Sequence, residues 1–187
     1  MPPKFKFTKE EIIYNALTLV RSQGFNSLTA RALGNRLGAS TKPIFGLFGS
    51  MEEVKDEVLA EADRIYHFYL EREIKSGEYP PYKASGMAYI RFAMEEAELF
   101  KLLFMRDRSG ENIEESHEEI RPQLEMIIKN LGISEEKALL FHLEMWVFVH
   151  GIATMTATSY LKWDRDFISS CLTDMYEGLK HRFRGNL

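Results

Sequence analysis

The sequence predicts an all-α protein in which a small three-helix domain at the N-terminus precedes a larger helical domain. Most segments place apolar residues at three- and four-residue spacing, which is the helical period, and strand-like alternation is nearly absent. Only 6 prolines and 12 glycines occur among the 187 residues, so few positions interrupt a helix. A content of 45% hydrophobic and 28% charged residues is typical of a water-soluble globular protein and excludes intrinsic disorder.

Cysteine usage and hydropathy favour the cytoplasm. Cys171 is the only cysteine, so it has no partner for an intrachain disulfide and no second thiol for a CxxC metal or redox pair. The first ten residues lack an apolar leader, and the longest apolar stretch, near 145–155, contains His150 and is too short to cross a bilayer. We therefore expect a cytoplasmic protein without a membrane segment.

Capping residues mark the first two helices. Thr8 and Glu11 have the spacing of a capping box, so the first helix is predicted to begin there. Gly24 stands where a left-handed C-cap residue is expected. Thr29 caps a second, short helix, which Gly38 ends.

A third, very short helix is predicted after this turn. Ser40 or Thr41 can cap it, and it extends through Phe48. Pro43 is tolerated because an amide in the first turn has no acceptor within the helix. A second capping box then begins a long helix over residues 50–75.

The remaining chain is predicted to form further helices. The segment Tyr79-Pro80-Pro81-Tyr82 separates them from the long helix, because each proline removes a donor and restricts the residue before it. The expected helices run over residues 83–106 with a break near Glu96, 114–131, 134–160 and 164–183.

Charge is distributed unevenly along the chain. The first 50 residues contain seven basic and two acidic residues, a net charge of +5, and the other 137 residues sum to -9. A basic segment on a larger acidic body indicates an anionic partner for the first part, and nucleic acid is the usual anion of that size. A solvated basic face without a partner is the alternative.

The second and third helices, joined by Gly38-Ala39-Ser40, have the spacing of a helix-turn-helix. In that motif the second helix braces the third, which lies in the major groove. Lys42 would then meet a phosphate or a guanine edge, and Thr41 a phosphate or a base. A three-helix lobe that only packs on the body is the alternative. The DNA-binding candidates are Thr29, Ser40, Thr41, Lys42, Pro43, Phe45, Gly46 and Phe48.

Residues 8–59 resemble the TetR family of bacterial transcriptional regulators. The resemblance lies in four stretches: Ile12-Ile13-Tyr14-Asn15-Ala16, Gly24-Phe25, Leu28-Thr29-Ala30-Arg31-Ala32-Leu33, and Gly38 to Val54. It implies a cytoplasmic homodimer whose N-terminal domains bind double-stranded DNA at a palindromic operator. It also implies that the larger helical domains dimerise and hold a small-molecule effector. On this basis, we expect residues 1–53 to be the DNA-binding domain and residues 54–187 to be the effector-binding and dimerisation domain.

Two positions depart from the family pattern. Phe45 stands where the family commonly has a tyrosine whose hydroxyl meets a phosphate, and Met51 stands where a lysine is common. Each change removes a polar phosphate contact, so DNA affinity would depend more on Lys42, Thr29 and a basic arm at residues 4–6. A helical small-molecule binding protein with weak or lost operator binding is therefore the alternative function.

A second resemblance points to an effector pocket. The segment Trp146-Val147-Phe148-Val149-His150-Gly151 is similar to the Trp-His-Gly signature of one TetR ligand-domain subgroup. On a helix His142, Trp146 and His150 share one face. The candidate pocket residues are Tyr89, Phe92, Met105, Met126, His142, Trp146 and His150. Such aromatic and methionine side chains are also common in a plain core, which is the alternative for each of them.

A homodimer seam is predicted on the last two helices, packed as a four-helix bundle with the second copy. The alternative is that the same apolar stripe faces the chain's own core. The seam candidates follow three- and four-residue spacing on the last helix: Phe167, Ile168, Cys171, Leu172, Met175 and Leu179.

Catalytic and metal motifs are incomplete, so we expect no enzyme, no metal site and no cofactor. His117-Glu118-Glu119-Ile120-Arg121 begins like a zincin HExxH motif, but Arg121 occupies the position of the second ligand. His142-Leu143-Glu144 has the HxE of a zinc deaminase without the PCxxC that would follow. Neither GxSxG nor a P-loop occurs in the sequence.

Overall fold

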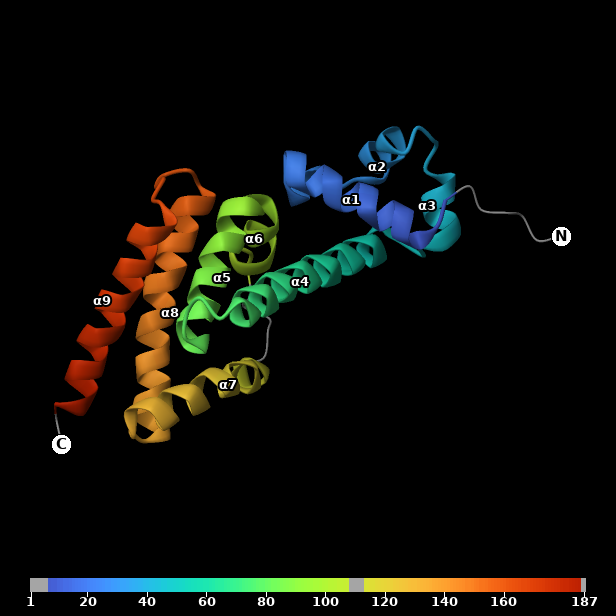
Figure 1. Cartoon of the computed structure of the whole chain (residues 1–187). Coiled ribbons are helices and arrows are strands. Elements are labelled where there is room, and N and C mark those ends of the chain that lie inside the picture. Colours follow the sequence, from blue (N-terminus) through green and yellow to red (C-terminus); the bar gives the residue numbers. More distant parts are fainter. Residues whose placement is uncertain (1–6, 108–112, 186–187) are drawn as a thin grey trace. The chain divides into compact units, whose positions relative to one another are not determined.

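The computed structural model describes residues 7–107 and 113–185, with residues 113–119 described by their backbone alone. The described residues form α-helices and one short 3-10 turn without a strand, which confirms the predicted all-α class (Figure 1). The helices are α1 Lys9–Gln23, α2 Ala30–Arg36, α3 Lys42–Leu47, α4 Met51–Ser76, α5 Pro81–Glu95, α6 Ala97–Phe104, α7 Ile113–Leu131, α8 Glu135–Ala157 and α9 Arg165–Arg184, and the 3-10 turn is Phe25–Ser27.

The chain divides into two compact units. Unit 1 comprises Met1–His67 and Glu96–Arg106, and unit 2 comprises Phe68–Glu95 and Asp107–Leu187. The single helix α4 contributes its first part to unit 1 and its last turns to unit 2. The predicted boundary after residue 53 does not coincide with the division between these units, and the assignment of functions to residues 1–53 and 54–187 stays a prediction.

The N-caps of α1 and α2 act as the sequence predicts. The Thr8 hydroxyl accepts a hydrogen bond from the Glu11 amide at 3.2 Å, and the Glu11 carboxylate accepts one from the Thr8 amide at 2.8 Å. The Thr29 hydroxyl accepts from the Ala32 amide at 3.2 Å. These bonds satisfy amides that have no partner within the helix, and so fix where α1 and α2 begin.

Helix α6 packs on α1 within unit 1. Arg21 of α1 donates two hydrogen bonds, of 2.8 and 2.7 Å, to the Glu96 carboxylate just before α6. Gly24 has a φ of 77°, and a Cβ there would lie 3.0 Å from the Glu98 carboxylate. The predicted break near Glu96 is confirmed, because α5 ends at Glu95 and α6 begins at Ala97. The largest fully buried side chains of this unit are Ile12, Val20, Leu33, Ile44, Phe48, Leu99 and Phe100.

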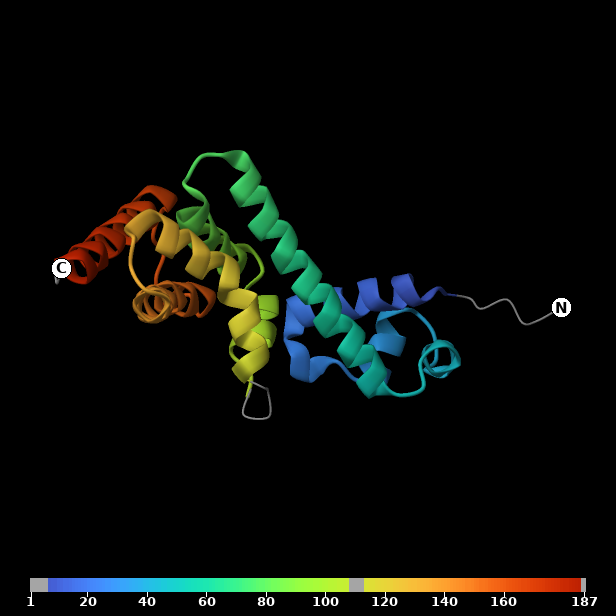
Figure 2. The same ribbon diagram turned by 90° about the horizontal axis from the view of Figure 1, so that it is seen from below.

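In unit 2, α5 and α8 pack together, and α7 and α9 contact α8 as well. Helix α9 lies alongside α8 in both ribbon views (Figures 1 and 2). The fully buried Phe141 ring of α8 contacts Tyr82, Tyr176 and Phe183 at ring-centroid distances of 5.3–6.3 Å. Aromatic side chains from α5, α8 and α9 therefore hold one end of this unit together.

Three helix ends in unit 2 can be compared with the predictions. Helix α5 begins at Pro81 rather than residue 83, because proline is well suited to the first position of a helix. Helix α8 ends at Ala157 rather than residue 160, since Ser159 adopts a left-handed φ of 59°. The Asp164 carboxylate accepts from the Phe167 amide at 2.8 Å, which confirms the predicted start of α9.

The predicted dimer seam on α9 is wrong for three of its six residues. Ile168, Leu172 and Leu179 are buried in the protomer itself. A Cβ added to Gly86 of α5 would lie 3.1 Å from the Leu172 side chain, so α5 and α9 approach closely there. The spacing on α9 marks the side that faces its own unit, which was the stated alternative. Phe167 is exposed, and Cys171 and Met175 are partly buried.

Helix α8 is the one helix of the described residues that is long and apolar enough to cross a membrane. Core helices of soluble proteins pass the same test. In this structure Glu144 of α8 pairs with Arg182 of α9, and two histidines of α8 contact tyrosines of α5. These polar contacts fit a helix that packs within unit 2.

Candidate functional site

The turn between α2 and α3 has the tight geometry of a helix-turn-helix. Gly38 adopts a φ of 61°, which favours glycine. At Gly34 a Cβ would lie 3.1 Å from the carbonyl oxygen of Ala39, so α2 approaches the turn closely. The Ser40 hydroxyl accepts from the Lys42 amide at 3.4 Å, whereas Thr41, the N-cap of α3, makes no side-chain capping hydrogen bond.

The structure exposes most of the candidate DNA-binding residues. Of the eight, Thr29, Ser40, Lys42, Phe45 and Gly46 are exposed, and Thr41 and Pro43 are partly buried. Phe48 is the exception, because its side chain is only 2% exposed and its ring lies 4.8 Å from the Lys9 ammonium. The Phe48 side chain is therefore packed inside unit 1, where it holds the end of α3 in place, and it is not available for direct contact with DNA.

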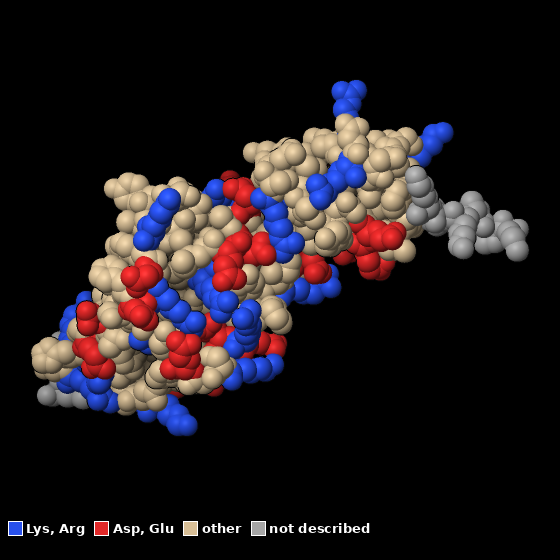
Figure 3. Space-filling view, turned by 45° about the horizontal axis from the view of Figure 1, so that its top comes forward, with Lys and Arg blue, Asp and Glu red and all other residues tan. Residues whose placement is uncertain are grey.

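Two arginines of α2 join Lys42 as candidate phosphate contacts. Arg31, Arg36 and Lys42 are exposed, and none of them forms an ion pair with another described residue. Figure 3 shows blue side chains on the upper surface of unit 1 in that view, with red side chains of this unit below them. The sequence interpretation counted Arg31 and Arg36 only as charge. Their exposure on the helix before the turn makes them candidates, whereas Lys4 and Lys6 of the predicted arm lie outside the described residues.

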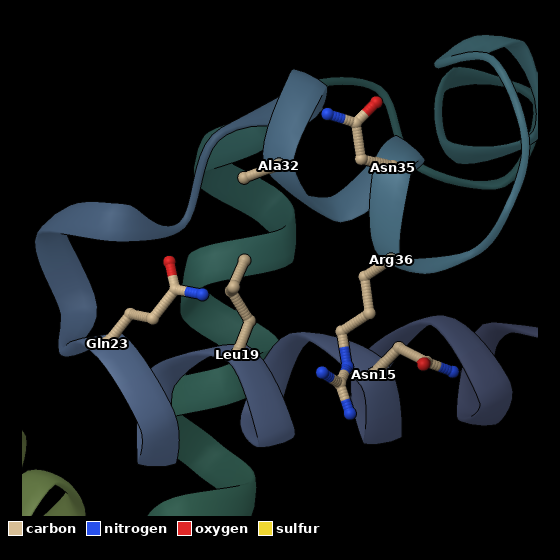
Figure 4. Close-up of a pocket in the computed structure, with 6 residues that line it drawn as sticks. All are labelled: Asn15, Leu19, Gln23, Ala32, Asn35 and Arg36. Carbon is tan, nitrogen blue, oxygen red and sulfur yellow. The ribbon is translucent and has the colours of Figure 1, made fainter.

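A polar hollow of about 600 Å³ lies between α1 and α2 (Figure 4). The Arg36 side chain extends from α2 towards α1 beside Asn15, and Gln23 and Leu19 rise from α1 towards α2. Its lining consists of Asn15, Leu19, Gln23, Ala32, Asn35 and Arg36. None of these residues belongs to the predicted effector pocket.

Two tyrosine–histidine pairs join α5 to α8 in unit 2. The Tyr82 hydroxyl lies 3.1 Å from Nδ1 of His142, and the Tyr89 hydroxyl lies 2.8 Å from Nδ1 of His150. Burial lowers the pKa of both histidines and raises the pKa of Tyr82. Each hydroxyl can therefore donate to a neutral imidazole.

The other candidate pocket residues lie in several environments. Phe92 is fully buried against Tyr69 at a ring-centroid distance of 5.5 Å, and Met126 is partly buried on α7. Trp146 stacks on His150 at 5.0 Å, yet 45% of its surface is exposed. Met105 is exposed and belongs to unit 1. The structure thus brings together Tyr89, His150 and Trp146, while a common pocket for all seven residues stays a prediction.

Acidification should destabilise unit 2 through His142. The pKa of His142 is lowered in the folded protein, so below about pH 6.5 the unfolded chain binds more protons than the folded chain. Folding stability therefore decreases as the pH decreases through this range. The loss of melting temperature between pH 7.5 and pH 5.5 should therefore be larger for the natural protein than for His142→Gln. Equal losses in both proteins would assign the pH dependence to other groups.

A second hollow, of about 250 Å³, lies where α4, α5 and α9 meet within unit 2. Glu73 of α4 is 3% exposed, and among the described residues it is the one charged residue that is buried. It accepts hydrogen bonds from Arg91 of α5 and Arg165 of α9. Sequence reasoning missed this group because its three members are far apart in the chain.

These features define a class of protein. An exposed helix-turn-helix, with cations that form no ion pair with another described residue, is an arrangement found in DNA-binding proteins. The family model described as "Tetracyclin repressor-like, C-terminal domain" matches residues 82–177, more than half of the chain. The chain therefore belongs to the tetracycline repressor-like family of transcriptional regulators. No curated protein matches it. Membership of the Trp-His-Gly subgroup stays a prediction.

Proposed function

We propose that this protein is a homodimeric transcriptional repressor that binds a palindromic operator and is released by a small hydrophobic effector. The observation that carries the proposal is the helix-turn-helix with its exposed Lys42 at the start of α3, which forms no ion pair with another described residue. Family membership supports the same class of function. No step of the proposal requires a cofactor, a metal or a chemical reaction.

The geometry of α2 and α3 supports a groove-binding role. Thr41 and Lys42 occupy the beginning of α3, the part of a recognition helix that contacts base edges. Arg31 and Arg36 on α2 provide charges suited to the phosphates that flank a groove. Phe45, 49% exposed on α3, can contact a thymine methyl group but donates no hydrogen bond.

An exposed apolar face on α8 supports dimerisation. Soluble monomers seldom leave a long row of large apolar side chains in water. Because α9 packs beside α8, two copies can form the predicted four-helix bundle through this face. The face comprises Leu140, Leu143, Trp146, Val147 and Met155, with Phe167 exposed on α9.

Lys42→Ala should weaken operator binding by about tenfold, because it removes one contact per protomer with phosphate or guanine. Gel-shift titration against DNA fragments that flank the protein's own gene measures the effect. Lys162→Ala, at an exposed lysine in unit 2, is the matched control and should bind like the natural protein. Equal affinity of Lys42→Ala and the natural protein would remove α3 from the DNA interface.

Loss of operator binding is the alternative, and Phe45 and Met51 favour it. Both residues replace polar phosphate contacts that the family resemblance would place there. In this alternative the protein binds a small molecule and no DNA. The same titration separates the two functions, because the alternative predicts no shift with any flanking fragment at low salt.

A further inference from the structure

The hollow at α4, α5 and α9 combines a charged end with an apolar wall. Met87, Ile90 and Ile168 form its buried apolar part, and Met94 is a more exposed lining residue. The charged lining residues are Glu73, Arg91, Glu95 and Arg165. None of these eight residues belongs to the predicted effector pocket.

The charged end has spare hydrogen-bond donors. Nε of Arg91 donates to Glu95 at 2.8 Å, and Nη1 makes a long contact of 3.5 Å with Glu73. Nη2 of Arg91 forms no hydrogen bond with any described residue, although a guanidinium has five N–H donors. Both oxygens of Glu73 already accept hydrogen bonds, from Arg91 and Arg165. Arg165 also donates to Glu78 at 2.7 Å, so the two guanidinium groups face three carboxylates, and their spare N–H groups are what an added acceptor can use.

The volume of the hollow limits the size of the ligand. Its volume of about 250 Å³ is close to that of about eight water molecules in the liquid. A straight-chain carboxylate of roughly six to eight carbons fills such a space. Met87 and Met94 have flexible, unbranched side chains, which adapt to a flexible alkyl chain.

We infer that this hollow binds a short aliphatic carboxylate, whose head group pairs with Arg91 and Arg165 and whose chain packs on Met87, Ile90 and Ile168. Fork-shaped guanidinium groups bind carboxylates through paired N–H donors. The ligand's carboxylate competes with Glu73 for the same two arginines. The site lies among three helices, one of which, α4, continues into unit 1.

The competition with Glu73 gives the site a regulatory consequence, which rests on the proposed function. Glu73 ties the end of α4 to α5 and α9 through Arg91 and Arg165. A bound carboxylate takes over these donors and loosens that tie. Such a ligand changes DNA affinity because it favours the state in which the end of α4 is no longer tied to α5 and α9.

Binding is tested by titration calorimetry of the full chain with sodium octanoate, without DNA. We expect one site per protomer, with affinity falling about fourfold for each methylene removed from the chain. Octylammonium and 1-octanol should bind at least tenfold more weakly, because neither supplies a charged acceptor to the arginines. Absence of binding, or equal binding of octylammonium, would overturn the inference.

Two variants test the named contacts. Glu73→Gln removes the competing charge, so octanoate should bind at least fivefold more tightly, an effect that a purely structural Glu73 would not produce. Met94→Glu adds a negative charge to the lining at an exposed position and should weaken octanoate at least fivefold. Phe68→Glu, at an exposed residue of α4 outside the lining, is the matched control and should leave affinity unchanged. If Glu73→Gln does not fold, Met94→Glu decides the result, and unchanged binding in that variant contradicts the site.

A gel shift with octanoate separates this inference from the proposed function. If octanoate binds as expected and the protein shifts no DNA, the site stands and the repressor function fails. If the protein shifts DNA and octanoate does not bind, the repressor function stands and the site fails. Release of DNA by octanoate, enhanced in Glu73→Gln, supports both.

Discussion

Raising the salt concentration from about 50 to 200 mM should weaken operator binding about a thousandfold. The estimate follows from the exposed cations of unit 1. Arg31, Arg36 and Lys42 provide three per protomer and hence six in a dimer, and each neutralised phosphate releases condensed counterions. With six such contacts, a plot of the logarithm of affinity against the logarithm of salt concentration has a steep slope. Fluorescence anisotropy with a labelled operator fragment at several salt concentrations measures this slope.

Variants at the three positions show which cations contribute. Lys42→Ala should reduce the slope by about two for a dimer, since one contact per protomer is lost. Lys9→Ala is the control, because Lys9 already pairs with Glu53 at 3.1 Å and should contribute less. Affinity that is insensitive to salt would show that phosphates are not contacted, and the groove-binding proposal would then fail.

The local signals in the sequence predicted the helices well. Thr8 and Thr29 cap helices as expected, because a cap involves residues only two or three positions apart, and Asp164 caps the helix that was expected to begin there. Ser50 and Glu53 show the limit of such patterns. The Glu53 amide donates to the Ser50 hydroxyl as in a capping box, but the Glu53 carboxylate accepts from the Gly49 amide at 2.6 Å.

Burial of whole helix faces was harder to predict. The stripe on α9 has the right spacing for a seam, yet spacing alone does not say whether a face meets a second copy or the same chain. On α8 the difference has the opposite direction: Trp146 was expected in a pocket, but its side chain is nearly half exposed. Apolar residues surround much of α8, so its sequence gives little indication of which side packs on α5.

Long-range polar groups could not be predicted at all. Glu73 meets Arg91 and Arg165, which are 18 and 92 positions away in the chain. No periodic pattern links residues at such separations, and each of the three side chains alone looks like an ordinary solvated charge. The buried position of Glu73 is known only once α4, α5 and α9 are placed together.

Two glutamate substitutions, one on α8 and one on α9, should have different consequences: the first should separate the dimer, and the second should unfold unit 2. Val147 of α8 is 63% exposed in the protomer, so Val147→Glu should change the free energy of unfolding of the monomer by less than about 0.5 kcal/mol. In a dimer the same carboxylate would be buried in an apolar seam without a partner, at a cost of several kcal/mol. We therefore expect folded monomers, detected by sedimentation velocity together with an unchanged far-UV spectrum.

Leu172→Glu should instead unfold unit 2. Leu172 is 2% exposed, and the Leu172 side chain lies close to Gly86 of α5. A carboxylate placed there would be shielded from water, so the expected loss exceeds about 4 kcal/mol, a large part of the stability of a typical domain. Thermal unfolding and near-UV spectra measure the loss. If Leu172→Glu gave folded monomers and Val147→Glu stayed dimeric, the seam would lie on the α9 stripe after all, and the exposed face of α8 would need another partner.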